Sequence, residues 1–304
     1  MKRGRRWLRL GLAVIALPLT ALLLAALAVL GHNEWRHART LRDGAAHAWP
    51  MPALPGEARA PVIVLLHGAG LNGRAWDPVR RRLEPRWRVV ALDLPGHAAD
   101  RAHVYTLQAA AAQVAALART VAPAPLILVG DSLGGYTAMG TASAVPPAQL
   151  RGLVVAGASA TMGHRSALAY LRDAPLVWAM AATIDVRRRV GGLLQTMGYA
   201  EPDRRAVLDA GVELNAVPAA VRDLLYVDFR ARLAALDVPV LITNGSLDER
   251  AVSQEDDYAA AAKRPLRHRF EGCEHGVSMR RPAEFARLVD DFATRVFAQA
   301  PSPT

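Results

Sequence analysis

The pattern of apolar and polar positions divides the chain into segments of different kinds. From residue 61 onward, short and continuously apolar runs alternate with stretches of helical periodicity. Continuous apolar runs rich in β-branched residues are typical of parallel strands buried on both faces. The runs that predict strands are 61–67, 87–93, 124–130, 150–159, 237–245 and 267–273. This alternation predicts an α/β fold with a mostly parallel sheet and helices on both of its faces.

Helical periodicity fills the intervals between these runs, and one interval is much longer than the others. The expected helices lie at 74–84, 106–121, 134–144, 252–264 and 282–298. Thr106 is placed to cap the second of them. Residues 160–233 contain helical stretches and no clear β-rich run. An insertion of this size between two strands predicts a helical cap on a core formed by residues 61–159 and 234–299.

The N-terminal segment has a long apolar stretch behind a basic flank. Residues 1–9 carry five basic side chains, and residues 10–30 contain no charged residue. A helix over the second range would be about 31 Å long, enough to cross the hydrocarbon core of a bilayer. Trp7 and Trp35 flank it where aromatic residues meet membrane interfaces. The pattern therefore predicts a single transmembrane anchor.

A cleaved signal peptide is the alternative for this segment, because Ala26-Leu27-Ala28 resembles a cleavage site. The apolar stretch exceeds the roughly 7–15 residues of a signal peptide, which favours the anchor. Fewer basic residues follow the stretch than precede it. That bias predicts the N-terminus inside and the catalytic domain on the periplasmic or extracellular side, with a secreted protein as the alternative. Residues 31–60, polar at first and then rich in proline, are expected to form a linker.

Composition narrows the classes of function without selecting one. The 304 residues carry a net charge of +10 at neutral pH, and five of the positive charges stand before residue 10. No basic stripe with interleaved aromatic residues occurs in the sequence, so a nucleic-acid partner is not expected. Cys273 is the only cysteine, which excludes an internal disulfide and a cysteine-rich metal site.

The polar residues after the second predicted strand were considered as metal ligands. Asp93, His97, Asp100 and His103 lie close together there. Their spacing matches no standard zinc motif, so neither a metal nor another cofactor is expected. His67, at the end of the first strand, is expected to order its loop rather than to act as a catalytic base.

A serine between glycines directly follows the third predicted strand, in Gly130-Asp131-Ser132-Leu133-Gly134. The small residues permit a sharp turn from strand into helix, which holds the serine hydroxyl out at the carboxyl end of the strand. This context predicts that Ser132 is a nucleophile. The alternative is a tight turn with a purely structural role.

A serine nucleophile needs a base, and in this architecture the base comes last along the chain. The downstream histidines are His164, His268 and His275. His164 lies in the predicted cap and His268 within a strand. His275 stands in a loop after a strand end and before a helix, so it is the expected base.

The base must in turn be oriented by an acid that lies between the serine and the histidine in the sequence. Asp248 stands just past the carboxyl end of the strand at 237–245, whereas Asp237 lies at its other end. Asp248 is therefore the expected acid, with its neighbour Glu249 as the fallback.

Two backbone N–H groups should stabilise the negative charge that develops on the substrate oxygen. The first is that of Leu133, which follows the serine at the start of a helix. The second should come from the loop after the first strand, where Ala69 is favoured and Gly70 is the alternative.

The motifs in their order and spacing resemble the α/β-hydrolase superfamily. They are "LLHGAGLN..AW", "VVALDLPGH", "GDSLGG", "NGSLDE" and "EHGVSMRRPAEF", and they extend over residues 61–298. The first two are similar to the carboxylesterase branch that includes pimeloyl-ester hydrolases. The resemblance implies a triad of Ser132, Asp248 and His275 with an oxyanion hole from Leu133 and Ala69. It fixes no substrate, and the N-terminal apolar segment departs from typical members of the family.

The expected function is that of a membrane-tethered serine hydrolase that cleaves a small-molecule carboxylic ester through an acyl-enzyme. Acyl transfer, peptide cleavage or perhydrolysis on the same triad, and non-catalytic ligand binding, are the alternatives. Four large apolar side chains of the cap are candidates to line a slot for a lipophilic acyl group: Met162, Trp178, Met180 and Met197. Alternatively, these residues only pack the cap onto the sheet.

Overall fold

A parallel β-sheet forms the centre of the computed structural model, which describes residues 2–43, 47, 49, 51–52, 54, 56–160 and 163–298. Within these residues the sheet has six strands in the order β2-β1-β3-β4-β5-β6, all paired in parallel. The strands are β1 (Val62–Leu66), β2 (Arg88–Leu92), β3 (Leu126–Asp131), β4 (Leu150–Ala156), β5 (Pro239–Gly245) and β6 (Arg264–Phe270). The parallel sheet predicted from the alternation is therefore present.

Strand β1 shows why the strands read as continuous apolar runs. All five of its residues are buried. Val62, Val64 and Leu66 point into one core, and Ile63 and Leu65 point into the other. Successive side chains of a strand point to opposite faces, so a sheet covered on both faces requires apolar residues at every position.

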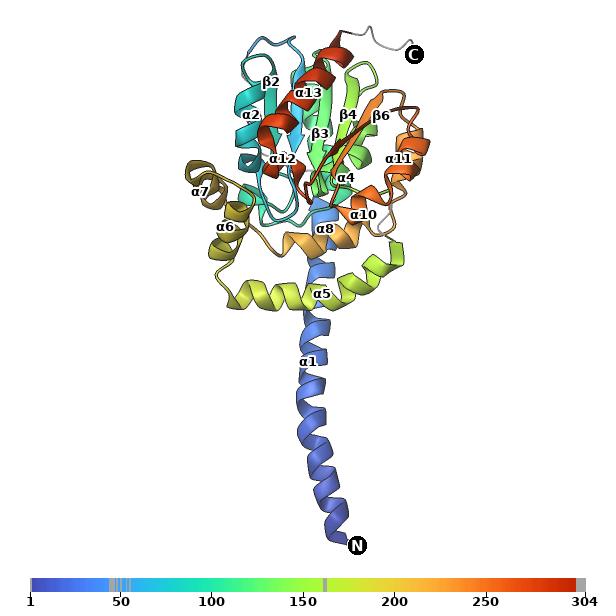
Figure 1. Ribbon diagram of the computed structural model, residues 1–304. Coiled ribbons are helices and arrows are strands. Elements are labelled where there is room, and N and C mark those ends of the chain that lie inside the picture. Colours follow the sequence, from blue (N-terminus) through green and yellow to red (C-terminus); the bar gives the residue numbers. More distant parts are fainter. Residues whose placement is uncertain are drawn as a thin grey trace.

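Helices cover both faces of the sheet (Figure 1). One face packs against α2 (Asp77–Leu83) and α13 (Pro282–Phe297). The other packs against α3 (Leu107–Val121), α4 (Leu133–Thr141) and α11 (Glu255–Ala261). Thr106 caps α3, as predicted, by accepting a hydrogen bond from the N–H of Ala109 at 3.0 Å.

The last strand begins and ends earlier than the run 267–273 predicted. Strand β6 lies at the edge of the sheet and pairs only with β5, and most of its residues are exposed. An exposed edge strand carries no apolar run, so its bounds depend on pairing, which starts at Arg264 opposite Pro239. The helix expected at 252–264 is likewise divided into α10 (Glu249–Val252) and α11.

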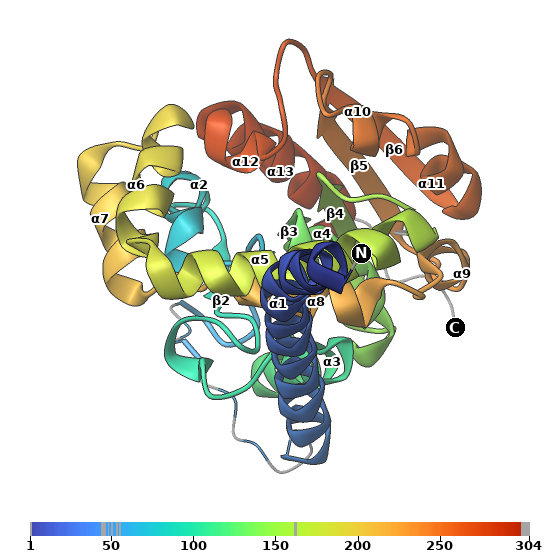
Figure 2. The ribbon, with the colours of Figure 1, turned by 90° about the horizontal axis from the view of Figure 1, so that it is seen from below.

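A group of helices stands between β4 and β5, in the interval where the alternation breaks. They are α5 (Gly163–Thr183), α6 (Val186–Thr196), α7 (Glu201–Ala210), α8 (Ala216–Leu224) and α9 (Phe229–Ala234). We call residues 163–224, which hold α5 to α8, the cap. It lies at the end of the sheet where α4 begins (Figures 1 and 2). The N–H of Glu213 in the cap donates to the carbonyl of Gly70, in the loop after β1, at 3.0 Å.

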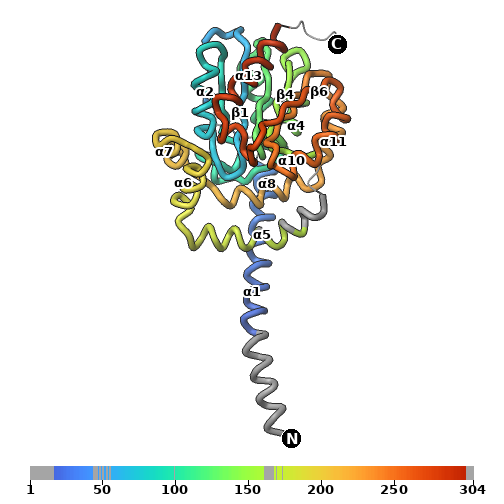
Figure 3. Tube along the Cα trace, in the orientation of Figure 1, coloured from blue at the N-terminus to red at the C-terminus, as the bar shows by residue number. Residues whose placement is uncertain are grey.

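The N-terminal helix α1 (Lys2–Asp43) is longer than the apolar stretch predicted, and it extends away from the sheet and cap (Figures 1 and 3). The residues after position 30, expected to begin a linker, continue this helix as far as Asp43. Their polar side chains have partners on the body of the protein: Glu34 pairs with Arg222, and Thr40 Oγ1 accepts the N–H of Val104. These distant partners, which the pattern cannot reveal, explain the polarity of the segment.

Part of α1 has the length and composition of a membrane span. The candidate is Leu17–Asp43, with a mean hydropathy of 1.4 in its most apolar window. None of that window is buried against the rest of the protein. An apolar and unburied helix of this kind is also found in signal sequences, so its role is taken up under Proposed function.

Candidate active site

Ser132 occupies a sharp turn between β3 and α4, as predicted from its glycine neighbours. Its backbone has φ +58° and ψ −118°, a conformation that residues with side chains rarely adopt. The turn depends on small neighbours, because a Cβ at Gly130 would lie 2.0 Å from the carbonyl oxygen of Gly134. A Cβ at Gly134 would lie 1.8 Å from the carbonyl oxygen of Leu66. No other residue type fits at these positions without movement of the backbone.

The three side chains singled out in the sequence form one hydrogen-bonded chain. Ser132 Oγ lies 3.0 Å from His275 Nε2, and His275 Nδ1 lies 2.6 Å from Asp248 Oδ2. Nδ1–H donates to the carboxylate, which leaves Nε2 to accept the serine hydroxyl proton. The residues come from the carboxyl ends of β3 and β5 and from the loop after β6, which parallel strands bring to one edge of the sheet.

The electrostatics of this chain favour a proton on the histidine. The hydrogen bond to the Asp248 carboxylate raises the pKa of His275 above 6.5, burial opposes the shift, and the negative charge of Asp131 adds to it. The pKa of Asp248 is lowered overall: burial raises it, but the hydrogen bond and positive charge of His275 outweigh that effect. Asp248 also caps α10 by accepting the N–H of Ala251 at 3.4 Å.

Asp131 is part of this site and was missed by the sequence reasoning. Its Oδ2 accepts hydrogen bonds from both the backbone N–H and the hydroxyl of Ser278. Its Oδ1 is buried and has no hydrogen-bond partner among the residues that the structure describes. A Cβ at Gly157 would lie 2.8 Å from Asp131 Oδ1 and 3.0 Å from His275 Cε1, so the two groups border the same glycine. The available signal was a charged residue at the end of a wholly buried strand.

Two buried histidines shape the loop after β1. His97 Nε2 accepts the N–H of Gly70 at 3.0 Å, and His67 Nε2 accepts the N–H of Leu94 at 3.0 Å. Their Nδ1–H groups donate to the carbonyls of Pro95 and Gly68, respectively. Burial lowers the pKa of His67 to about 4 and that of His97 to about 3, so both rings are neutral at pH 7.

These hydrogen bonds distinguish Ala69 from Gly70, the two candidates for the second oxyanion donor. The N–H of Gly70 is engaged by His97, whereas the preceding residue, Ala69, lies in the same partly buried loop. Leu133, the residue expected to supply the first donor, begins helix α4 directly after Ser132. The geometry therefore favours Ala69 over Gly70.

Comparison with known proteins places this arrangement in a family. The profile of the alpha/beta hydrolase family matches residues 63–288, more than half of the chain. The chain belongs to the α/β-hydrolase family. This agrees with the resemblance seen in the motifs and with the fold expected from it.

The relatives indicate the kind of hydrolase. A pimeloyl-[acyl-carrier protein] methyl ester esterase of Sodalis glossinidius is 30% identical over 247 residues, which cover 76% of this chain and 93% of that protein. A solved carboxylesterase structure from the thaumarchaeon Nitrososphaera gargenis has a TM-score of 0.66 and 18% identity, covering 81% of this chain and 94% of the other. The protein is thus similar to esterases, and it is a hydrolase of the carboxylesterase kind.

A further relative shows how widely this similarity extends. The magnesium-chelatase 30 kDa subunit of Rhodobacter capsulatus is 32% identical over 154 residues, which cover 47% of this chain and 53% of that protein. Similarity of this degree therefore does not specify a substrate for the hydrolase.

A small cavity lies beside Ser132. His67, Leu71, Ala75, Trp76 and Met279 are among the residues that line it. Its volume is about 10 Å³, whereas pockets for small-molecule ligands hold on the order of 300–1,000 Å³. This cavity is too small for a substrate and leaves room for about one water molecule.

Four residues were proposed for an acyl slot, and the three that the structure describes are not gathered in one place. Met162 lies outside the described residues. Trp178 is 43% exposed on α5, and Met180 is partly buried on the same helix. Met197, at the end of α6, packs in one apolar cluster with Leu71 and Met279, which line the cavity beside Ser132. Of the three that the structure describes, Met197 is the one linked to the surroundings of the serine.

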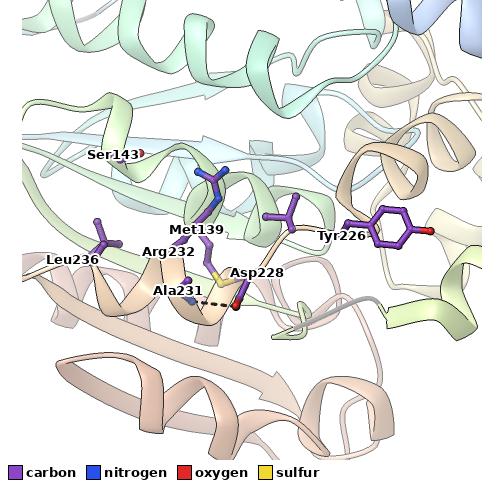
Figure 4. Close-up of a pocket in the computed structure, with 9 residues that line it drawn as sticks. Met139, Ser143, Tyr226, Asp228, Ala231, Arg232 and Leu236 are labelled. Carbon is purple, nitrogen blue, oxygen red and sulfur yellow. Dashed lines mark hydrogen bonds between the residues drawn. The ribbon is translucent and has the colours of Figure 1, made fainter.

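A larger pocket lies between α4 and α9 and is separate from Ser132 (Figure 4). Its volume is about 540 Å³, and Met139, Tyr226, Asp228 and Arg232 are among its lining residues. None of its lining residues is Ser132, His275 or Asp248. It is a groove on the side of the core.

One histidine–carboxylate cluster has ligand types that suit a metal. His103 Nδ1 lies 2.6 Å and His47 Nε2 lies 3.2 Å from Asp100 Oδ1. His103 and Asp100 were considered from the sequence, but His47 stands in the range expected to be a linker. Asp93 and His97 point elsewhere, because they accept backbone N–H groups of Gly73 and Gly70.

Proposed function

We propose that this protein hydrolyses a carboxylic ester through an acyl-enzyme formed on Ser132. The observation that carries the proposal is the hydrogen-bonded chain from Ser132 through His275 to Asp248, at 3.0 Å and 2.6 Å. It lies in a protein whose relatives include a methyl ester esterase. A serine, a base and an orienting acid in this order constitute the machinery of acyl transfer.

The reaction follows from the direction of these hydrogen bonds. His275 Nε2 takes the proton of Ser132 as its oxygen attacks the acyl carbon, and Asp248 stabilises the resulting imidazolium. The N–H groups of Leu133 and Ala69 stabilise the tetrahedral oxyanion. His275 then gives the proton to the leaving alcohol, and water, activated by the same base, releases the acid.

The membrane tether is the second part of the proposal. Helix α1 contains a candidate span whose most apolar window is unburied, and five basic residues precede the apolar stretch. We place the N-terminus inside and the catalytic domain outside, according to this charge bias. The substrate class is a small ester with an apolar acyl group. This is in keeping with Leu71 and Met279, which line the cavity beside Ser132, and with Met197, which packs in the same apolar cluster.

Replacement of the serine tests the chemistry. Ser132→Ala should lower kcat/KM for a p-nitrophenyl ester on the order of 10³-fold or more, because only binding and oxyanion stabilisation remain. Ser143→Ala, at an exposed serine outside the site, is the matched control and should keep full activity. A fluorophosphonate probe should label the wild type and Ser143→Ala but not Ser132→Ala. Turnover retained by a folded Ser132→Ala protein would exclude the mechanism.

A further inference from the structure

Helix α5 exposes large apolar side chains to its surroundings. Leu168 is 70% exposed, Leu171 55%, Leu176 57% and Trp178 43%. A surface helix of a water-soluble protein normally turns polar residues outward, so large apolar side chains exposed on one helix mark an interaction site. The exposed Arg172 is a cationic residue among them. The opposite side of α5 is already occupied, because Tyr170 and Ala174 are buried against the rest of the protein.

The position of α5 relates this exposed face to helix α1. In Figure 1, α5 runs across the direction of α1 and lies farther from the sheet than the other cap helices. Figure 2, seen from below, shows α5 in front of α8 on the side toward which α1 extends. A bilayer crossed by α1 would therefore meet α5 before any other part of the cap.

The length of α1 agrees with that placement. Leu30 of α1 packs against Tyr170 and Ala174 of α5 and against Leu225. Helix α1 therefore passes α5 at Leu30. Twenty residues separate Leu10 from Leu30, which is about 30 Å of helix and equals the hydrocarbon thickness of a bilayer. If the basic residues 1–9 lie at one membrane interface, the opposite interface lies where α5 crosses α1.

The residues on either side of Leu30 suit these two environments. Toward the N-terminus, Leu17, Leu19, Leu22, Leu23, Leu24 and Leu27 of α1 are all exposed. Beyond Leu30, Trp35 is half-exposed with the guanidinium of Arg39 5.8 Å from its ring centroid. Aromatic and cationic side chains are typical of the headgroup region. The start of α6, directly after α5, adds the exposed Arg188 and Arg189.

The orientation of α5 is held by contacts that fix α1 to the body. Arg222 donates two hydrogen bonds to the carboxylate of Glu34, from Nε at 2.9 Å and from a terminal nitrogen at 2.5 Å. His37 Nε2 lies 2.6 Å from Asp223 Oδ1. Farther along, Arg36 donates to the carbonyls of Arg101 and His103. A helix fixed at several levels holds the cap in one orientation toward the bilayer, unlike a flexible tether.

We infer that α5 lies in the plane of the membrane, with Leu168, Leu171, Leu176 and Trp178 in the lipid interface of the bilayer that α1 spans. The occupant of this face is lipid, as the contact of α5 with α1 and the exposed leucines of α1 indicate. The inference rests on the proposed tether. It adds that the cap itself contacts the bilayer, which places the cap where lipophilic esters concentrate.

Depth-dependent quenching in vesicles tests this placement on the full chain. Cys273 is buried, and Cys273→Ser provides a background for single labels. Leu168→Cys and Leu176→Cys report on α5, and Leu24→Cys reports on the span. Asp256→Cys, at an exposed position of α11, is the matched control. Each protein is reconstituted in phosphatidylcholine–phosphatidylglycerol vesicles that carry nitroxide quenchers at shallow or deep positions, and a fluorescent thiol label is read.

The expected pattern separates the two proposals. Labels at 168 and 176 should be quenched at least about twofold by the shallow lipid, the label at 24 by the deep lipid, and the label at 256 by neither. If the label at 24 is quenched but the labels at 168 and 176 behave like the label at 256, α5 does not touch the bilayer. The inference is then overturned. A second copy of the chain covering this face would give that result. An unquenched label at 24 overturns the tether itself.

Discussion

Ser132 has a backbone conformation that costs free energy, and the residues around it maintain that conformation. Its positive φ places the hydroxyl 3.0 Å from His275 Nε2. Strain of this kind costs on the order of 1–3 kcal/mol and persists where neighbouring structure determines it. Here the close contacts at Gly130 and Gly134 do so.

The pKa of His275 predicts the pH dependence of the reaction. A base must be neutral to accept the serine proton, so activity should fall as the pH drops through the pKa of His275. The hydrogen bond to Asp248 raises that pKa above 6.5, so the acid limb of kcat/KM should have its midpoint above pH 6.5. Rates from pH 5 to 9, with circular dichroism to verify folding, measure this. A profile flat down to pH 5 in a folded protein would contradict the role of His275.

Asp131 should tune this midpoint without taking part in proton transfer. Its negative charge raises the pKa of His275, so Asp131→Asn should move the acid limb to lower pH and leave the rate on the alkaline plateau within a few-fold. Asp248→Asn is the contrast, because loss of the orienting carboxylate should lower the rate by up to about 10⁴-fold across the pH range. An acid limb that does not move in Asp131→Asn would show that Asp131 acts only through Ser278.

At the scale of elements, the site depends on the close approach of α4 to β1. Gly134, in the first turn of α4, faces the carbonyl oxygen of Leu66 at the end of β1. This contact sets how near the serine turn lies to the loop that carries Ala69. The distance between the two elements should therefore affect the proposed oxyanion hole as well as the core.

A single methyl group at this contact should displace the site. Gly134→Ala would place a Cβ 1.8 Å from Leu66 O, so α4 must shift and both activity and thermal stability should fall substantially. Gly192→Ala is the matched control, because a Cβ there, in helix α6, would meet nothing within 4 Å in the described residues beyond its chain neighbours and the backbone of its own helix. It should raise stability by about 0.5–1 kcal/mol with unchanged kcat/KM. Equal behaviour of the two variants in thermal unfolding and esterase assays would contradict this account of the contact.

At the scale of the whole molecule, α1 has an exposed apolar part and a part that packs against the cap. Its most apolar window within Leu17–Asp43 is unburied, while its last turns pack against the cap through Leu30 and the Glu34–Arg222 pair. The cap is thus completed by residues from the far end of the chain, so the boundary of the stable domain lies near residue 29.

Two truncations test that boundary. A protein lacking residues 2–28 keeps the docked turns and should retain its melting temperature and kcat/KM on a soluble ester. A protein lacking residues 2–44 loses Leu30 and the partner of Arg222, and exposes Leu225. Loss of about 2 kcal/mol should lower its melting temperature by roughly 4–8 °C. If both truncated proteins melt together, the docked turns add no stability.

The sequence by itself determined the local features of this protein. Parallel strands buried on both faces must be apolar throughout, so β1 to β5 were visible as runs. The turn at Ser132 was visible because it requires glycines, and the search for a base and an acid after it found two residues that the structure brings together with it. Each of these signals lies within a few neighbouring residues, where sterics and periodicity operate.

Only the tertiary structure decided the features that depend on distant partners. The pairing of β6 with β5 set the bounds of an edge strand that has no apolar pattern. Arg222 and Asp223 turned the polar residues after position 30 into a docked helix instead of a linker. His97 took the N–H of Gly70, and Asp131 came to lie beside His275. In each case the free energy arises between residues far apart in the chain, and no local pattern encodes which partner a polar group will find.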